Sequence, residues 1–121
     1  MSRTDELNKI LRALQSSTPD IEAASIMTDD GLVIASALPQ HIEEIRVAGI
    51  SATILSLGSR ATAELERGQL EQVLIRGANG YIVMAAASQG TLLMVMTTRE
   101  AKLGLIFLDM SRAIQEIKKV L

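Results

Sequence analysis

Cysteine and tryptophan are both absent from this chain of 121 residues. Without cysteine there can be no disulfide, no thiolate metal site and no cysteine nucleophile. Only one tyrosine and one phenylalanine are present, too few for the stacked aromatic platforms that hold single-stranded nucleic acids. The composition therefore excludes disulfide-stabilised folds and argues against binding of single-stranded RNA or DNA.

Excess charge of one sign and long apolar runs are also absent. The 12 basic and 14 acidic side chains leave a formal net charge of -2, without the basic stripe that neutralises nucleic-acid phosphates. No apolar run reaches the ~18 residues of a membrane-spanning helix, and the polar segment 1–6 is unlike a signal peptide. We expect one cytoplasmic domain over residues 1–121 that neither binds nucleic acid nor spans a membrane.

The spacing of apolar residues and turn signals predicts a helix, two strands, a long helix, three strands and a helix. Helices are expected over residues 4–16, 42–67 and from a capping box at Thr97 and Glu100 to about residue 121, and strands over residues 21–28, 32–37, 70–76, 81–87 and 91–97. This order predicts an α/β (α+β) sandwich, α-β-β-α-β-β-β-α. A five-stranded antiparallel sheet should have the long helix on one face and the other two helices on the opposite face. The apolar strand 91–97 should be central, and strand 70–76 should be an edge.

The long helix carries two apolar stripes on nearly opposite faces. A branched stripe should face the core of its own subunit: Val47, Ile50, Ile54, Leu57, Ala61 and Leu65. The second stripe consists mostly of small residues, which would let another helix approach closely. With the apolar edge strand, it predicts a dimer interface at Ile45, Gly49, Ala52, Ser56, Ser59, Ala63, Val73 and Ile75. The alternative is a solvated helix face that happens to be rich in small residues.

Candidate catalytic and ligand-binding groups are few, and each has a simpler explanation. His41, the only histidine, directly precedes the long helix, where a capping or solvated role is expected. Asp29 and Asp30 suit a turn, and no further oxygen ligand for a divalent cation lies near them in sequence. The segment 77–80 lacks the Gly-Lys-Ser or Gly-Lys-Thr of a phosphate-binding loop. We therefore predict no enzyme activity, no cofactor and no metal. Core filling is expected of Met84, Met94, Met96 and Met110.

Four stretches carry a family resemblance. They are DDGLVIAS at 29–36, ERGQLEQVLIRG at 66–77, NGYIVM at 79–84 and LGL at 103–105. Taken together, in this order and at this spacing, they resemble the roadblock (dynein light chain) superfamily and, more narrowly, the bacterial MglB-type regulators of Ras-like GTPases. The resemblance covers about residues 7–121.

The resemblance implies both a fold and a way of binding partners. Members form homodimers or heterodimers through the long helix and the strand after it, which joins two sheets into one. Members bind small Ras-like GTPases; some activate GTP hydrolysis, and others are scaffolds or motor light chains. MglB-type proteins insert no arginine finger, so arginines of the long helix are expected to make contacts rather than catalyse. The chain lacks the long C-terminal extension of some MglB-type members, which favours an adaptor over a full activator.

We therefore expect a homodimer that binds a small Ras-like GTPase and modulates its GTPase cycle. The expected contacts with the GTPase lie on the polar flank of the long helix, at Arg46, Thr53, Arg60 and Glu64. Two alternatives stay open. One is a passive scaffold or light chain that binds its partner regardless of nucleotide. The other is a small-molecule sensor, which would need a pocket with convergent polar groups.

Overall fold

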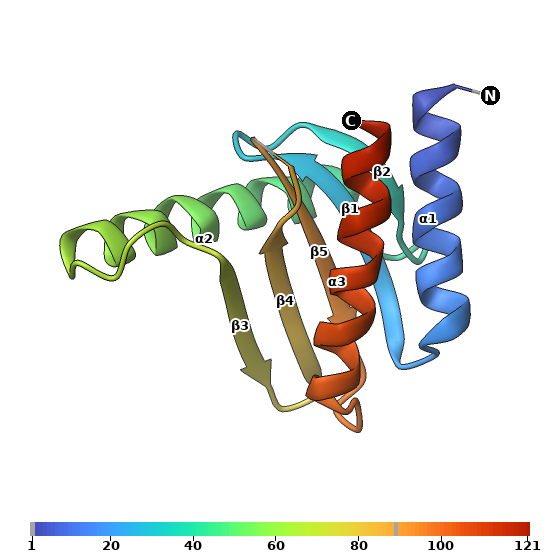
Figure 1. The fold of residues 1–121 in the computed structure, drawn as a ribbon. Helices are drawn as coiled ribbons and strands as arrows, with labels where there is room; N and C mark the ends of the chain where they lie inside the picture. The colour runs from blue at the N-terminus through green and yellow to red at the C-terminus, as the bar shows by residue number, and fades with distance from the viewer. Residues whose placement is uncertain (1, 89) are drawn as a thin grey trace.

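The structure is a computed structural model that describes residues 2–88 and 90–121. Its elements follow the predicted order (Figure 1): α1 (Arg3–Ser17), β1 (Ile21–Thr28), β2 (Val33–Ala37), α2 (Glu44–Glu64), β3 (Gln72–Gly77), β4 (Gly80–Ala86), β5 (Thr91–Thr97) and α3 (Leu103–Val120). The expected α/β sandwich is therefore confirmed.

The strands form one five-stranded antiparallel sheet in the order β2-β1-β5-β4-β3. As predicted, β5 is central and β3 is an edge. In Figure 1, α1 and α3 lie side by side over one face of the sheet, and α2 crosses the opposite face near one end of the strands. The helices therefore cover the two faces of the sheet as predicted, but α2 leaves part of the sheet face that it crosses uncovered.

Two apolar clusters fill the spaces between these layers. The larger cluster lies between the sheet and the α1–α3 pair and includes Leu11, Val95 and Ile106. The smaller cluster lies under α2 and consists of Met27, Met84, Leu92 and Met94. Met96 is half-buried against it, and Met110 belongs to the larger cluster. The expectation that these methionines fill the core is confirmed.

The predicted orientation of the long helix is only partly right. Val47 and Ile54 of the branched stripe pack against the cluster under α2, as expected. Only Ala48 and Ser51 are buried on α2, whereas Ile50, Leu57 and Leu65 of the branched stripe are 51%, 66% and 69% exposed. The face of α2 that lies toward the sheet is therefore the one between the two predicted stripes, with Ala48 and Ser51 at its centre. The β1–β2 turn also comes close to the helix, since a β-carbon added at Gly31 would lie 3.4 Å from Ala52 Cβ. The long side chains of Met27, Met84 and Met94 fill the space between α2 and the sheet.

The predicted start of the last helix also differs from the structure. Thr97 stays in β5 and its hydroxyl donates a 2.9 Å hydrogen bond to the Thr98 carbonyl, so it does not cap α3. The N-cap of α3 is Lys102, which makes no side-chain capping bond. At the start of α1, by contrast, the Ser2 and Asp5 side chains form a capping box.

Candidate partner-binding surface

Large apolar side chains remain exposed along one flank of α2. Ile54 packs against the cluster under the helix. Ile50 and Leu57, four residues before it and three after it, lie on the same side of the helix but reach past the cluster into solvent. Leu65, at the C-terminal end of the helix, extends the row. Scattered exposed leucines are normal on a monomer, but a continuous row marks a contact surface.

The sheet continues this apolar row. Ile75 pairs with Ile82 and Ile82 with Met96, so the three side chains share one face of the sheet. Both Ile82 and Met96 are half-buried against the cluster under α2, and Ile75 is 36% exposed. These side chains form the floor of a step beside the helix. We call Ile50, Leu57, Leu65, Ile75, Ile82 and Met96 the α2–sheet step.

β3 presents an edge that no strand pairs with among the residues that the structure describes. Its side chains are exposed on both faces, with Leu74 44% exposed on the side away from α2. An apolar edge with free backbone N–H and C=O groups is a template for pairing with another strand. The geometry therefore offers two adjacent features, an apolar step and an open edge, that a second chain can cover together.

The eight residues predicted for the dimer interface are divided among three environments. Ile45, Gly49, Ala63 and Ile75 are exposed. Ala52 faces Gly31 of its own chain, and Val73 is half-buried against the cluster under α2. Ser56 and Ser59 line a hollow within the chain. The assignment of these residues to an interface stays a prediction. The branched row of Ile50, Leu57 and Leu65 was missed as a contact surface because it was assigned to the core.

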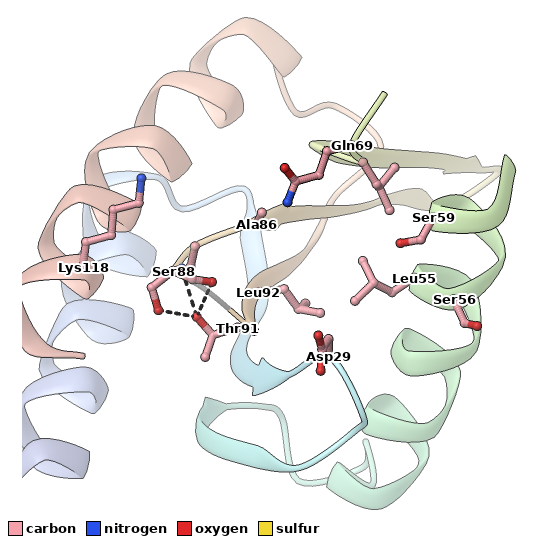
Figure 2. A pocket seen from close by; sticks show the side chains of 13 residues that line it. Asp29, Leu55, Ser56, Ser59, Gln69, Ala86, Ser88, Thr91, Leu92 and Lys118 are labelled. Carbon is pink, nitrogen blue, oxygen red and sulfur yellow. Dashed lines mark hydrogen bonds between the residues drawn. The ribbon is translucent and has the colours of Figure 1, made fainter. Parts of the chain in front are cut away.

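The hollow beside Ser56 and Ser59 has a volume of about 700 Å³ (Figure 2). Leu55 and Leu92 point into it from α2 and β5, and Asp29 and Lys118 are its charged lining residues. Its lining combines these leucines with small residues such as Ser59 and Ala86. The hydroxyls of Ser88 and Thr91, 2.7 Å apart, bond to each other. The hollow carries hydrogen-bonding groups, as a sensor would need. Among those of its lining residues that the structure describes, no nucleophile is hydrogen-bonded to a base.

The four predicted GTPase contacts lie in one row on the outer face of α2. Arg46, Thr53 and Arg60 are seven residues apart and therefore share a face, and all are exposed. Arg60 Nη2 lies 3.5 Å from Glu64 Oε1, with both side chains about two-thirds or more exposed. The Thr53 hydroxyl donates a 2.9 Å hydrogen bond to the Gly49 carbonyl. An exposed ion pair of this kind adds little stability, so the row is free for intermolecular contacts.

Over residues 2–88 and 90–121, no group of three or more His, Cys, Asp or Glu side chains is arranged to hold a metal ion. His41 is exposed just before α2, as expected. Within the same ranges, no helix is both long and apolar enough to cross a membrane.

Known proteins resemble this chain over nearly its whole length. Residues 7–97 match the Roadblock/LC7 domain family. The uncharacterized protein MJ1340 of Methanocaldococcus jannaschii is 35% identical over 112 residues, which are 93% of this chain and 96% of that protein. The structure of Myxococcus xanthus MglB matches with a TM-score of 0.90 at 18% identity, covering 99% of this chain and 90% of that one. A Roadblock/LC7 domain from Streptomyces avermitilis matches with a TM-score of 0.87 at 21% identity, covering 93% and 94%.

Proposed function

Because the chain belongs to the Roadblock/LC7 domain family, we propose that it is a homodimeric regulator or adaptor that binds a small Ras-like GTPase. The observation that carries the proposal is the α2–sheet step beside the open edge of β3. The GTPase part of the proposal rests on the family resemblance of the sequence and on the free polar row along α2. No catalytic role is assigned to the chain itself.

The dimer follows from what each exposed feature needs. Pairing of β3 with its own copy satisfies the free backbone groups of both edges and extends the sheet across two chains. The same twofold arrangement would place the α2 helix of each chain beside the step of the other, because an isologous interface uses the same patch twice. Burial of Ile50 and Leu57 would then stabilise the dimer by about 25 cal/mol for each Å² of apolar surface removed from water.

The GTPase would bind on the outward face of the paired helices. In this arrangement Arg46, Thr53, Arg60 and Glu64 stay outside the apolar step, since they lie on the side of α2 directed away from the sheet. Two arginines on one exposed row can pair with carboxylates of a partner at its polar rim, which affects association rate and specificity more than affinity. The resemblance to MglB-type proteins favours a contact role for these arginines over a catalytic one.

The test is affinity capture from a native lysate with the tagged chain, run in parallel with GDP and with a non-hydrolysable GTP analogue. We expect a small GTPase, identified by mass spectrometry and then purified, to bind preferentially in one nucleotide state. Single-turnover GTP hydrolysis with the purified pair then separates an activator from an adaptor. Equal retention in both states, or a partner that is not a GTPase, would favour the passive scaffold instead.

A further inference from the structure

A second hollow lies at the opposite end of β3 and β4 from the hollow of Figure 2. Its lining residues are Arg76, Gly77, Ala78, Tyr81 and Arg99, and its volume is about 240 Å³. It is therefore too small for a whole cofactor or drug-sized ligand, which usually needs a pocket of about 300–1,000 Å³. It has room for one polar head group.

The charged groups of this hollow all have the same sign. Arg76 and Arg99 both line it, and across the described ranges 2–88 and 90–121 neither has a carboxylate within ion-pair distance. Glu100 follows Arg99 in sequence but does not line the hollow. Two unpaired guanidinium groups in a chain with more acidic than basic residues indicate that their counter-ion comes from outside the chain.

Tyr81 supplies a third donor from the floor. It pairs with Arg76 across the β3–β4 ladder, so the two side chains share a face of the sheet. Its ring packs against the larger apolar cluster, while the residue also lines the hollow. A guanidinium presents several N–H donors in a fixed planar fork, and a phenol adds one O–H donor.

A close backbone contact brings the two arginines together. A β-carbon at Gly80 would lie 2.0 Å from the Thr97 carbonyl oxygen, so only glycine allows the β3–β4 turn to approach the end of β5. The Tyr81 N–H also donates a 3.4 Å hydrogen bond to the Thr97 hydroxyl. Arg99 follows two residues after Thr97, and the contact therefore places it across the hollow from Arg76. In Figure 1 this turn and the β5–α3 connection lie at the same end of the molecule.

We propose that Arg76, Arg99 and Tyr81 form a binding site for a phosphate group. Donors from three residues suit a tetrahedral dianion, which presents acceptor oxygens in several directions, better than a planar carboxylate, which a single guanidinium satisfies. The phosphate is either free in solution or carried as a monoester on a small metabolite, and the chemistry of recognition is the same. The site is separate from the polar row of α2 and does not depend on a GTPase.

The test is a titration of the full chain, labelled with nitrogen-15, followed by NMR. Inorganic phosphate, glycerol 3-phosphate and acetate are added separately at constant ionic strength. We expect the backbone signals of Gly77, Ala78 and Arg99 to shift with both phosphates and to respond about tenfold more weakly to acetate. Tighter binding of glycerol 3-phosphate would identify the monoester as the source, and equal binding would identify free phosphate. No shift at about 10 mM of either phosphate, or equal shifts with acetate, would overturn the proposal.

Variants separate a built site from general surface charge. Arg76→Lys and Arg99→Lys keep the charge but remove the planar fork, and each should weaken phosphate binding about tenfold. Tyr81→Phe should weaken it by a smaller factor. Arg12→Gln, which removes an exposed charge on α1, is the matched control and should leave binding unchanged. Unchanged binding in both lysine variants, or an equal loss in the Arg12 control, would contradict the site.

Discussion

Thr18 and Asp109, 91 residues apart in sequence, are joined by a buried hydrogen bond in which the Thr18 hydroxyl donates to the Asp109 carboxylate. Both residues are at least nine-tenths buried. Thr18 is the C-cap of α1 and its N–H bonds the Leu14 carbonyl, while Asp109 lies on α3. The bond therefore fixes the end of one helix against the middle of the other.

Loss of this bond should destabilise the chain. Asp109→Ala removes the acceptor and leaves the Thr18 hydroxyl buried without a partner, which should lower the free energy of unfolding by about 2 kcal/mol. Arg112→Ala is the matched control, because Arg112 lies 3.8 Å from the same carboxylate but its side chain is 73% exposed, and it should cost less than about 1 kcal/mol. Urea unfolding measures the free energy of unfolding of both variants. Equal losses in the two variants would show that the ion pair, not the buried bond, matters.

Leu57→Glu should abolish self-association. The substitution places a carboxylate on the α2–sheet step, where dimer formation would remove it from water without a partner. Leu57 is 66% exposed in the isolated chain, so the fold itself should persist. Light scattering gives the mass and circular dichroism the helix content. Thr53→Glu introduces the same charge on the outward face of α2 and should leave the dimer intact; a wild-type mass for Leu57→Glu would refute the interface.

Charge reversal on the polar row tests the GTPase contacts. Arg46→Glu combined with Arg60→Glu should weaken GTPase binding about tenfold or more, because like charges across an interface repel. Dimer mass should not change, since both side chains lie outside the step. Arg12→Glu combined with Lys119→Glu makes the same change in net charge on α1 and α3. Affinity measured by calorimetry should fall only for the pair on α2; an unchanged affinity there would move the GTPase to another surface.

Gly80→Ala should destabilise the chain by about 3 kcal/mol. The added carbon would lie 2.0 Å from the Thr97 carbonyl oxygen. Because this oxygen belongs to the backbone, it cannot relieve the clash by a change of side-chain rotamer. Gly104→Ala is the control, because a β-carbon there has no neighbour within 4 Å. Thermal unfolding of both variants checks the difference. A small effect at Gly80 would mean that the β3–β4 turn can shift away from β5, which would also separate Arg76 from Arg99.

The sequence predicts the order of the elements well because each strand and helix has its own local pattern. The alternation and turn signals around Asp29–Gly31 and Asn79–Gly80 are local, and both hairpins form where expected. The central place of β5 follows from its continuous apolar run. Local patterns do not, however, show how a helix is rotated about its own axis.

The rotation of α2 could not be predicted because both of its stripes are apolar enough to be buried. Size favoured Ile50 and Leu57 for the core, but the face that packs against the sheet lies between the two stripes and includes Ala48, Ser51 and Ile54. The substitution Ala52→Glu would therefore be a poor test of a dimer interface on the small-residue stripe. Because Ala52 faces Gly31 of its own chain, a glutamate there would destabilise the fold itself. The pairing of Arg76 with Arg99 could not be predicted either, since the 22 intervening positions give no sign that the two residues line one hollow.

The C-terminal part of α2 extends beyond β3 in Figure 1 and buries no residue after Ser51. A helix with so little support from its own chain is marginal in water. If a second copy of the chain binds only when this part of α2 is folded, dimer formation stabilises the helix. The folded fraction of the helix then increases with protein concentration. The melting temperature should therefore rise with protein concentration, and dilution should loosen this end of the helix before the rest of the molecule.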